Sequence, residues 1–197
     1  ERPRVTFAAT YPASDKNAER RFPARSALDT VISLWGSRAV KNIVVMTPFV
    51  GQRTDREDSV LQRLRKLRMG PNVVGGLLVP EVSGQVGPKP VVPLPGRFGE
   101  CWQELFGENA YVRPIPEQCE GEARKRALHA KALMLTGENV ELLMIGSSNF
   151  TPRGMGVGTF NCEANLIFED NPNVERGGSK LDDRLRVIPR LWDDIEA

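Results

Sequence analysis

The stretch ALHAKALMLTGENVELLMIGSSNFTPRGMGVGTFNCEANLIF, residues 127–168, contains the only histidine of the chain, His129. Lys131 follows two positions later, and side chains two residues apart on a β-strand point to the same side. The spacing therefore predicts that His129 and Lys131 share one face of a strand. The alternate positions are apolar, and we expect them to face the core: Leu128, Ala130, Ala132 and Met134.

A second apolar run, residues 140–145, predicts a neighbouring strand. It follows the sequence TGEN at residues 136–139, which suits a hairpin turn because it contains a glycine between polar residues. The run leads into a segment where glycine allows the chain to turn and short polar side chains are presented. This segment consists of Gly146, Ser147, Ser148 and Asn149.

A third run, residues 161–168, predicts another strand. Alternation places Glu163, Asn165 and Ile167 on one face, and the other face carries Cys162, Ala164, Leu166 and Phe168. Side by side, the three strands would bring an imidazole, an ammonium, hydroxyls, a carboxamide and a carboxylate to one place. Such a set of groups is suited to handling a phosphate.

Three motifs in this stretch resemble those of the phospholipase D superfamily. They read HAK at residues 129–131, GSSN at 146–149 and NCE at 161–163, in the order of the family. The chain departs from the family pattern at Thr136, where aspartate is usual. The resemblance implies an α/β fold, with a mixed β-sheet flanked by helices on both faces, and a single domain over residues 1–197.

The resemblance also implies an active site assembled from two copies of the motif. In the family, one histidine is the covalent nucleophile and the histidine of the other copy is the general acid. This chain has one histidine and one copy of the motif. We therefore expect it to be one half of an active unit, completed by a second copy in a homodimer or by a second domain.

The residue types in the stretch suit phosphodiester hydrolysis without a metal ion or another cofactor. His129 is the predicted nucleophile, because a phosphohistidine divides the reaction into two easier steps. Lys131 and Asn149 are expected to stabilise the phosphoryl oxygens, and Glu163 to accept a hydrogen bond from the imidazole. The predicted substrate-binding residues are Ser147, Ser148, Arg124, Lys125 and Arg126.

Basic stretches at residues 63–68 and 124–126 favour nucleic acid as the substrate. Two alternatives remain open. A lipid phosphodiesterase or transferase would need an exposed apolar rim, for which the loop at residues 80–97 offers Val91, Val92 and Leu94. The other alternative is a degenerate domain that binds nucleic acid without cleaving it.

The composition is that of an ordinary globular protein: 197 residues, 40% hydrophobic and 26% charged, with a net charge of +2. Three widely spaced cysteines and a single histidine argue against a disulfide framework and against structural zinc. We see neither an apolar run long enough to span a membrane nor a signal peptide, so we expect a cytoplasmic protein without a membrane anchor. The first residue, Glu1, suggests a piece of a longer protein.

Periodicity predicts the remaining elements. Strands are expected at residues 4–9, 42–47, 73–79 and 110–113, and helices at residues 24–38, 55–68, 98–105 and 181–195. The helix at 55–68 is expected to carry acidic residues in its first turn, where the helix dipole stabilises negative charge.

Overall fold

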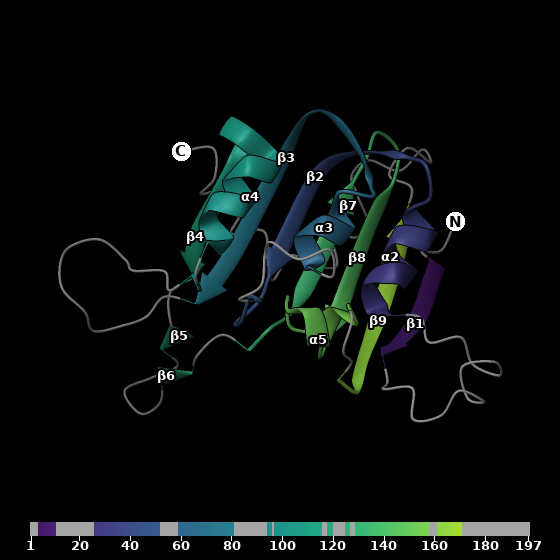
Figure 1. Ribbon diagram of the computed structural model, residues 1–197. Coiled ribbons are helices and arrows are strands. Elements are labelled where there is room, and N and C mark those ends of the chain that lie inside the picture. The colour runs from purple at the N-terminus through teal and green to yellow at the C-terminus, as the bar shows by residue number, and fades with distance from the viewer. Residues whose placement is uncertain are drawn as a thin grey trace.

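The computed structural model describes residues 4–10, 26–51, 59–80, 94–95, 97–115, 118–119, 125–126, 129–157 and 161–170. Its centre is a seven-stranded sheet in the order β1-β9-β8-β7-β2-β3-β4 (Figure 1). These strands are β1 (Arg4–Thr10), β2 (Ala39–Met46), β3 (Arg68–Pro80), β4 (Ala110–Ile115), β7 (Ala132–Thr136), β8 (Glu141–Gly146) and β9 (Glu163–Asp170). Neighbours among β2, β3 and β4 run parallel, and the other neighbours run antiparallel. A separate antiparallel ladder joins β5 (Gln118–Cys119) to β6 (Lys125–Arg126).

Short polar residues set the starts of several helices. The described helices are α2 (Ala27–Trp35), α3 (Val60–Leu64), α4 (Phe98–Phe106) and α5 (Pro152–Met155), with a 3-10 turn, η1 (Gly107–Asn109). Ser26, Ser59 and Thr151 each cap a helix by accepting a hydrogen bond from a backbone N–H in its first turn. Each cap satisfies a donor that the start of a helix leaves unpaired.

The main hydrophobic core lies between the sheet and helices α2, α3 and α4. The stripe of α2 contributes Leu28 and Trp35, which are fully buried. Phe98 and Trp102 of α4 stack with ring centroids 6.0 Å apart. Phe150, which follows β8, meets them edge-on with centroids at 6.3 and 6.2 Å. This aromatic cluster fixes the segment after β8 against α4.

The mixed α/β sheet that the sequence predicted is confirmed, but the described helices pack on one of its faces. The other face is apolar too, with a smaller buried cluster that includes Val44, Met46 and Leu78. The sequence also predicted a helix at residues 181–195, which lies outside the described residues. In the described part of the chain, helices therefore cover one face rather than both.

The predicted helix at residues 55–68 is wrong at its carboxyl end. Helix α3 ends at Leu64, and β3 already begins at Arg68, which pairs with Ala39. The pairing of β3 with β2 overrides the helix propensity of residues 65–68, because propensity is a weak preference compared with tertiary contacts. Residues 52–58, with the acidic positions, lie outside the described part, and Ser59 caps the described helix.

The two faces of β7 are the reverse of the prediction. Leu133 and Leu135 are fully buried in the main core. Ala132 and Met134, which were expected there, are half-buried against the smaller cluster. Both faces of the sheet are apolar, so alternation along the sequence does not tell which face the helices cover.

The amino-terminal side of the same motif also differs from the prediction. Strand β7 begins at Ala132, so His129 and Lys131 precede the strand. Ala130 is exposed rather than in the core, and Leu128 lies outside the described residues.

Candidate active site

Six of the predicted site residues gather at one edge of the sheet, where β2 and β8 end and β7 and β9 begin: His129, Lys131, Ser147, Ser148, Asn149 and Glu163. Met46 at the end of β2 pairs with Ala132 at the start of β7, and Gly146 at the end of β8 pairs with Asn165. The N–H of Gly146 also donates to the carbonyl oxygen of Lys131 at 3.3 Å. In Figure 1 this is the lower edge of the sheet, beside α5.

His129 and Lys131 form the centre of this edge. Lys131 Nζ lies 2.9 Å from His129 Nδ1 and donates to the carbonyl oxygen of His129 at 2.8 Å. His129 is exposed, whereas Lys131 is only 9% exposed. Burial lowers the pKa of the Lys131 ammonium, and the negative charge of Glu163 opposes that shift in part. An accessible imidazole thus lies beside a buried ammonium, which a hydrogen bond to the carbonyl oxygen of His129 holds in place.

Glu163 is held by neighbours other than the predicted one. Its Oε2 accepts a hydrogen bond from Ser147 Oγ at 2.5 Å, and its Oε1 accepts one from Asn161 Nδ2 at 3.4 Å. The N–H of Ala164 in turn donates to Ser147 Oγ at 2.9 Å. We expected Glu163 to accept a hydrogen bond from the imidazole, but the described neighbour of His129 Nδ1 is the ammonium of Lys131. Glu163 acts on this pair electrostatically, because its negative charge raises the pKa of Lys131 against the larger, lowering effect of burial.

Ser148 points away from solvent and ties the turn to the sheet. Ser148 and Asn165 are each 2% exposed, and Asn165 Nδ2 donates to Ser148 Oγ at 2.9 Å. The N–H of Ser148 donates back to Asn165 Oδ1 at 3.3 Å, and Asn165 Nδ2 also reaches the carbonyl oxygen of Ala8 at 3.4 Å. A side chain at Gly146 would meet the carbonyl oxygen of Ala164 at 2.3 Å, so only glycine fits there. Ser148 is therefore a support of the turn, and its hydroxyl is not available to substrate.

Asn149 and Phe150 complete the turn after β8. The Oδ1 atom of Asn149 is buried and has no hydrogen-bond partner among the described residues. The N–H of Phe150 donates to Thr47 Oγ1 at 3.1 Å, and the N–H of Gly51 donates to the carbonyl oxygen of Phe150 at 3.0 Å. The segment after β2 thus holds the turn in which Asn149 lies.

Two buried polar residues that support the site had no role in the sequence analysis. Thr47 is 1% exposed, and Asn165 was predicted only to share a face with Glu163, which the structure confirms. The position of each residue in the sequence could have indicated this supporting role. Thr47 closes an apolar strand, and Asn165 lies one alternation after Glu163.

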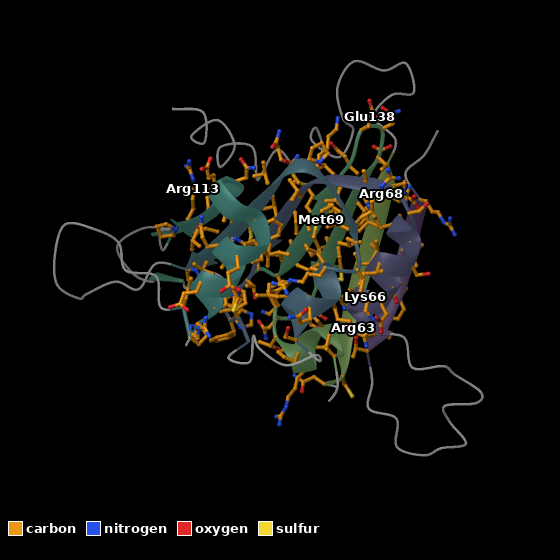
Figure 2. All side chains as sticks on the ribbon, turned by 45° about the horizontal axis from the view of Figure 1, so that its top comes forward. Arg63, Lys66, Arg68, Met69, Arg113 and Glu138 are labelled. Atoms are coloured by element: carbon orange, nitrogen blue, oxygen red, sulfur yellow. The ribbon has the colours of Figure 1, made fainter. Side chains whose placement is uncertain are left out.

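The structure does not bring all the predicted basic residues to this edge. Arg68 pairs with Ala39 at the far end of β2, about 23 Å from Met46 at the strand rise of ~3.3 Å per residue. Figure 2 shows Arg63, Lys66 and Arg68 in a row that runs toward Glu138, which lies in the hairpin between β7 and β8. Arg124 lies outside the described residues, and of Lys125 and Arg126 only the backbone of β6 is described.

Thr136, the position that departs from the family pattern, lies at the opposite end of β7 from the site. It is four residues from Ala132, about 13 Å at ~3.3 Å per residue. Thr136 Oγ1 accepts a hydrogen bond from Asn42 Nδ2 at 2.6 Å. The residue ends the strand rather than forming part of the turn, and it contacts none of the groups at the site edge that are described above.

Metal ligands do not cluster in the described part of the chain, where no group of three or more His, Cys, Asp or Glu side chains could hold an ion. Cys101 and Cys162 are free thiols. None of the described helices is long and apolar enough to cross a membrane.

The fold is an α/β fold with a mixed sheet, and the chain shares it with a solved structure of a tyrosyl-DNA phosphodiesterase. No protein-family model matches the chain, and no curated protein does so. The chain is similar to the crystal structure of a mutant of yeast tyrosyl-DNA phosphodiesterase, with a TM-score of 0.52 and 9% identity over 92% of this chain and 36% of that one. A second structure of the yeast tyrosyl-DNA phosphodiesterase matches with a TM-score of 0.46 and 11% identity, over 84% of this chain and 32% of that one. The chain thus spans about a third of the length of these structures.

Proposed function

We propose that this chain is one half of a metal-independent phosphodiesterase that cleaves nucleic acid through a phosphohistidine on His129. The observation that carries the proposal is the contact between Lys131 Nζ and His129 Nδ1, 2.9 Å apart, at the edge that also holds the Ser147–Glu163 pair and Asn149. An exposed nucleophile beside a buried cation is the arrangement that attack on a phosphodiester anion requires.

The first step forms a bond between a ring nitrogen of His129 and phosphorus, while the bond from phosphorus to the leaving oxygen breaks. The electron pair of the broken bond goes to the leaving oxygen, which takes a proton from a general acid. The ammonium of Lys131 and the carboxamide of Asn149 stabilise the charge on the phosphoryl oxygens. Water then attacks phosphorus and releases His129, and the conjugate base of the general acid takes a proton from that water. The products are one alcohol and one phosphomonoester.

The general acid in this scheme is His129 of a second copy. The chain contains one histidine, so a second imidazole must come from another chain or another domain. A two-fold axis that passes near the exposed His129 side chain would bring two such edges together, each supplying one ring.

Substrate binding is expected to change the contact between the two central residues. A neutral imidazole that accepts a hydrogen bond from Lys131 at Nδ1 carries its proton on Nε2, which is then not nucleophilic. A phosphodiester anion attracts the ammonium away from the ring, so the proton can move to Nδ1 and leave Nε2 free to attack. Nitrogen-15 chemical shifts of the His129 ring, recorded with and without a non-hydrolysable phosphonate, would report this change of tautomer.

Two features support nucleic acid rather than lipid as the substrate. The structural neighbour is by name a tyrosyl-DNA phosphodiesterase, which acts on a phosphodiester of DNA. Leu94, from the loop proposed as a lipid-binding rim, packs against the main core instead of lying exposed. Val91 and Val92 of that loop lie outside the described residues. Since Arg68 lies at the far end of β2, the proposal does not rest on the basic stretch at residues 63–68.

The test measures the molecular mass and the cleavage activity of the same chromatographic fractions. Light scattering gives the mass of each chromatographic fraction, and cleavage of a labelled single-stranded oligonucleotide is followed in EDTA. We expect cleavage in dimeric fractions, together with an acid-labile, alkali-stable phosphoryl adduct on the protein. His129→Asn should abolish both, while Lys41→Ala, which changes an exposed residue of β2 away from the site, should retain the adduct.

The outcomes separate the parts of the proposal. Cleavage by a monomer would contradict the shared site, and cleavage without an adduct would contradict the phosphohistidine. Binding of the oligonucleotide by a dimer that neither cleaves nor forms an adduct would favour a non-catalytic binding domain.

A further inference from the structure

Phe49 is an exposed aromatic residue at the edge that carries the candidate site. Its side chain is 59% exposed. The other large hydrophobic side chains that are exposed in the described residues are Val5, Phe7 and Leu166, and Phe7 pairs with Leu166 in the interior of the β1–β9 ladder. Phe49 is thus separate from that patch and follows the end of β2 by three residues.

The backbone of Phe49 lies between the two main parts of the site. On one side, Met46 pairs with Ala132, the residue after Lys131. On the other side, Val50 forms a β-bridge with Phe150, the residue after Asn149. Phe49 therefore connects the His–Lys segment to the turn after β8.

Thr47 holds Phe49 in place with a hydroxyl whose hydrogen-bonding capacity is fully used. Thr47 Oγ1 donates to the carbonyl oxygen of Phe49 at 2.8 Å and accepts from the N–H of Phe49 at 3.3 Å. It also accepts from the N–H of Phe150 at 3.1 Å. A hydroxyl has one donor and two acceptor sites, so a single buried side chain orders both the exposed aromatic residue and the turn. Single exposed apolar residues are common, so the anchoring of Phe49 carries more weight than its exposure.

From these contacts we infer that Phe49 is a stacking residue for a nucleic-acid base next to the phosphodiester that His129 attacks. Single-stranded nucleic acid is bound by aromatic rings that stack on bases and by cations that follow the backbone. Arg153 is an exposed cation in α5, next to Pro152, against which Gly51 packs closely. One isolated exposed ring suits a base, whereas a lipid surface requires a broader apolar area. This inference rests on the proposed function, of which it specifies the substrate as single-stranded and base-bearing.

The experiment compares two labelled oligomers with the full chain in EDTA: a single-stranded oligothymidylate, and a backbone of the same length built from abasic residues. Affinity is measured by fluorescence anisotropy, and cleavage is measured on gels. Phe49→Ala should weaken binding of the oligothymidylate about tenfold and leave the abasic oligomer unchanged, because stacking requires a base. Phe49→Trp should keep the affinity. Phe7→Ala, which removes a ring of similar exposure from β1, is the matched control and should change the affinity for neither oligomer.

Thr47 provides a second test that leaves the ring intact. Thr47→Val should weaken the oligothymidylate in the same direction as Phe49→Ala, and Thr47→Ser, which retains the hydroxyl, should not. Circular dichroism spectra of the variants should match that of the wild type, as a control that each variant is folded.

Failure of this inference and failure of the proposed function give different results. If the wild-type protein binds and cleaves both oligomers and Phe49→Ala does not distinguish them, the stacking role is overturned while the phosphodiesterase stands. If the wild-type protein neither binds nor cleaves either oligomer, both are overturned. If Phe49→Ala reduces binding to phosphatidylcholine vesicles and not to the oligothymidylate, the ring serves a lipid surface and the inference is wrong.

Discussion

The ammonium of Lys131 lies 2.9 Å from Nδ1 of His129 and is almost entirely buried, while the imidazole is exposed. Holding this cation costs the folded protein stability, because burial disfavours the charged form of Lys131. The proposed phosphate site depends on keeping this charge.

The first prediction is that Lys131→Met abolishes phosphodiester cleavage and raises the melting temperature at pH 7. Burial lowers the pKa of Lys131 from its usual 10.5, so near neutral pH the folded chain carries the full cost of a buried ammonium. As pH rises through the lowered pKa toward 10.5, the unfolded chain binds more protons than the folded one, and the stability of the wild type increases. Urea unfolding at several pH values should show the advantage of methionine shrinking in this alkaline range. An advantage that stays constant with pH would contradict a titrating Lys131.

The second prediction concerns the hydrogen bond between Ser147 Oγ and Glu163 Oε2, 2.5 Å long. Ser147→Ala and Glu163→Gln should each lower kcat by a factor on the order of 10–100, since small displacements of catalytic groups are costly. The double variant should be no worse than the poorer single variant, because both changes break one unit. Stability should change by less than about 0.5 kcal/mol, since the bond is exposed. Strictly additive losses in kcat would show that the two residues act separately.

The third prediction is that Asn165→Ala destabilises the protein by about 2 kcal/mol, because it leaves buried groups of Ser148 and Ala8 without their partner. Urea unfolding measures the effect. Asn161→Ala is the control, because Asn161 is an exposed residue of the same type and should change stability by about 0.5 kcal/mol or less. Equal effects of the two substitutions would contradict a structural role for the buried amide.

The fourth prediction is that Thr136→Asp leaves kcat/KM within about twofold of the wild type, because residues more than ~10 Å apart act independently in most cases. Aspartate also retains an acceptor for Asn42 Nδ2, whereas Thr136→Val removes it and should cost about 1 kcal/mol of stability. Kinetics and urea unfolding of both variants separate the two effects. A large gain in activity with Thr136→Asp would contradict this prediction, because it would show that the absence of an aspartate at position 136 lowers the activity of this chain.

Several features followed from local patterns in the sequence. The apolar periodicity of α2 and α4, and the alternation of β9 that places Glu163 and Asn165 on one face, depend on residues close in the chain. The spacing of two residues predicted that His129 and Lys131 point to the same side, and their side chains are in contact, although the two residues precede β7 rather than lying on it. Motif order then indicated that the turn after β8 and the start of β9 would adjoin this pair, as their register shows.

Other features depended on contacts between residues distant in the chain. Pairing with β2 ended α3 early, and the position of the helices decided that Leu133 and Leu135, not Ala132 and Met134, face the main core. Lys131 rather than Glu163 occupies His129 Nδ1.

By itself, the sequence determined the class of fold and the residue types of the candidate site, because strand alternation, helix stripes and motif spacing are properties of neighbouring residues. The tertiary structure alone decided which partners those residues have. Thr47 reaches Phe150 across 103 positions of the chain, and Asn165 reaches Ala8 across 157. Contacts of that kind arise when the sheet assembles, and no local pattern encodes them.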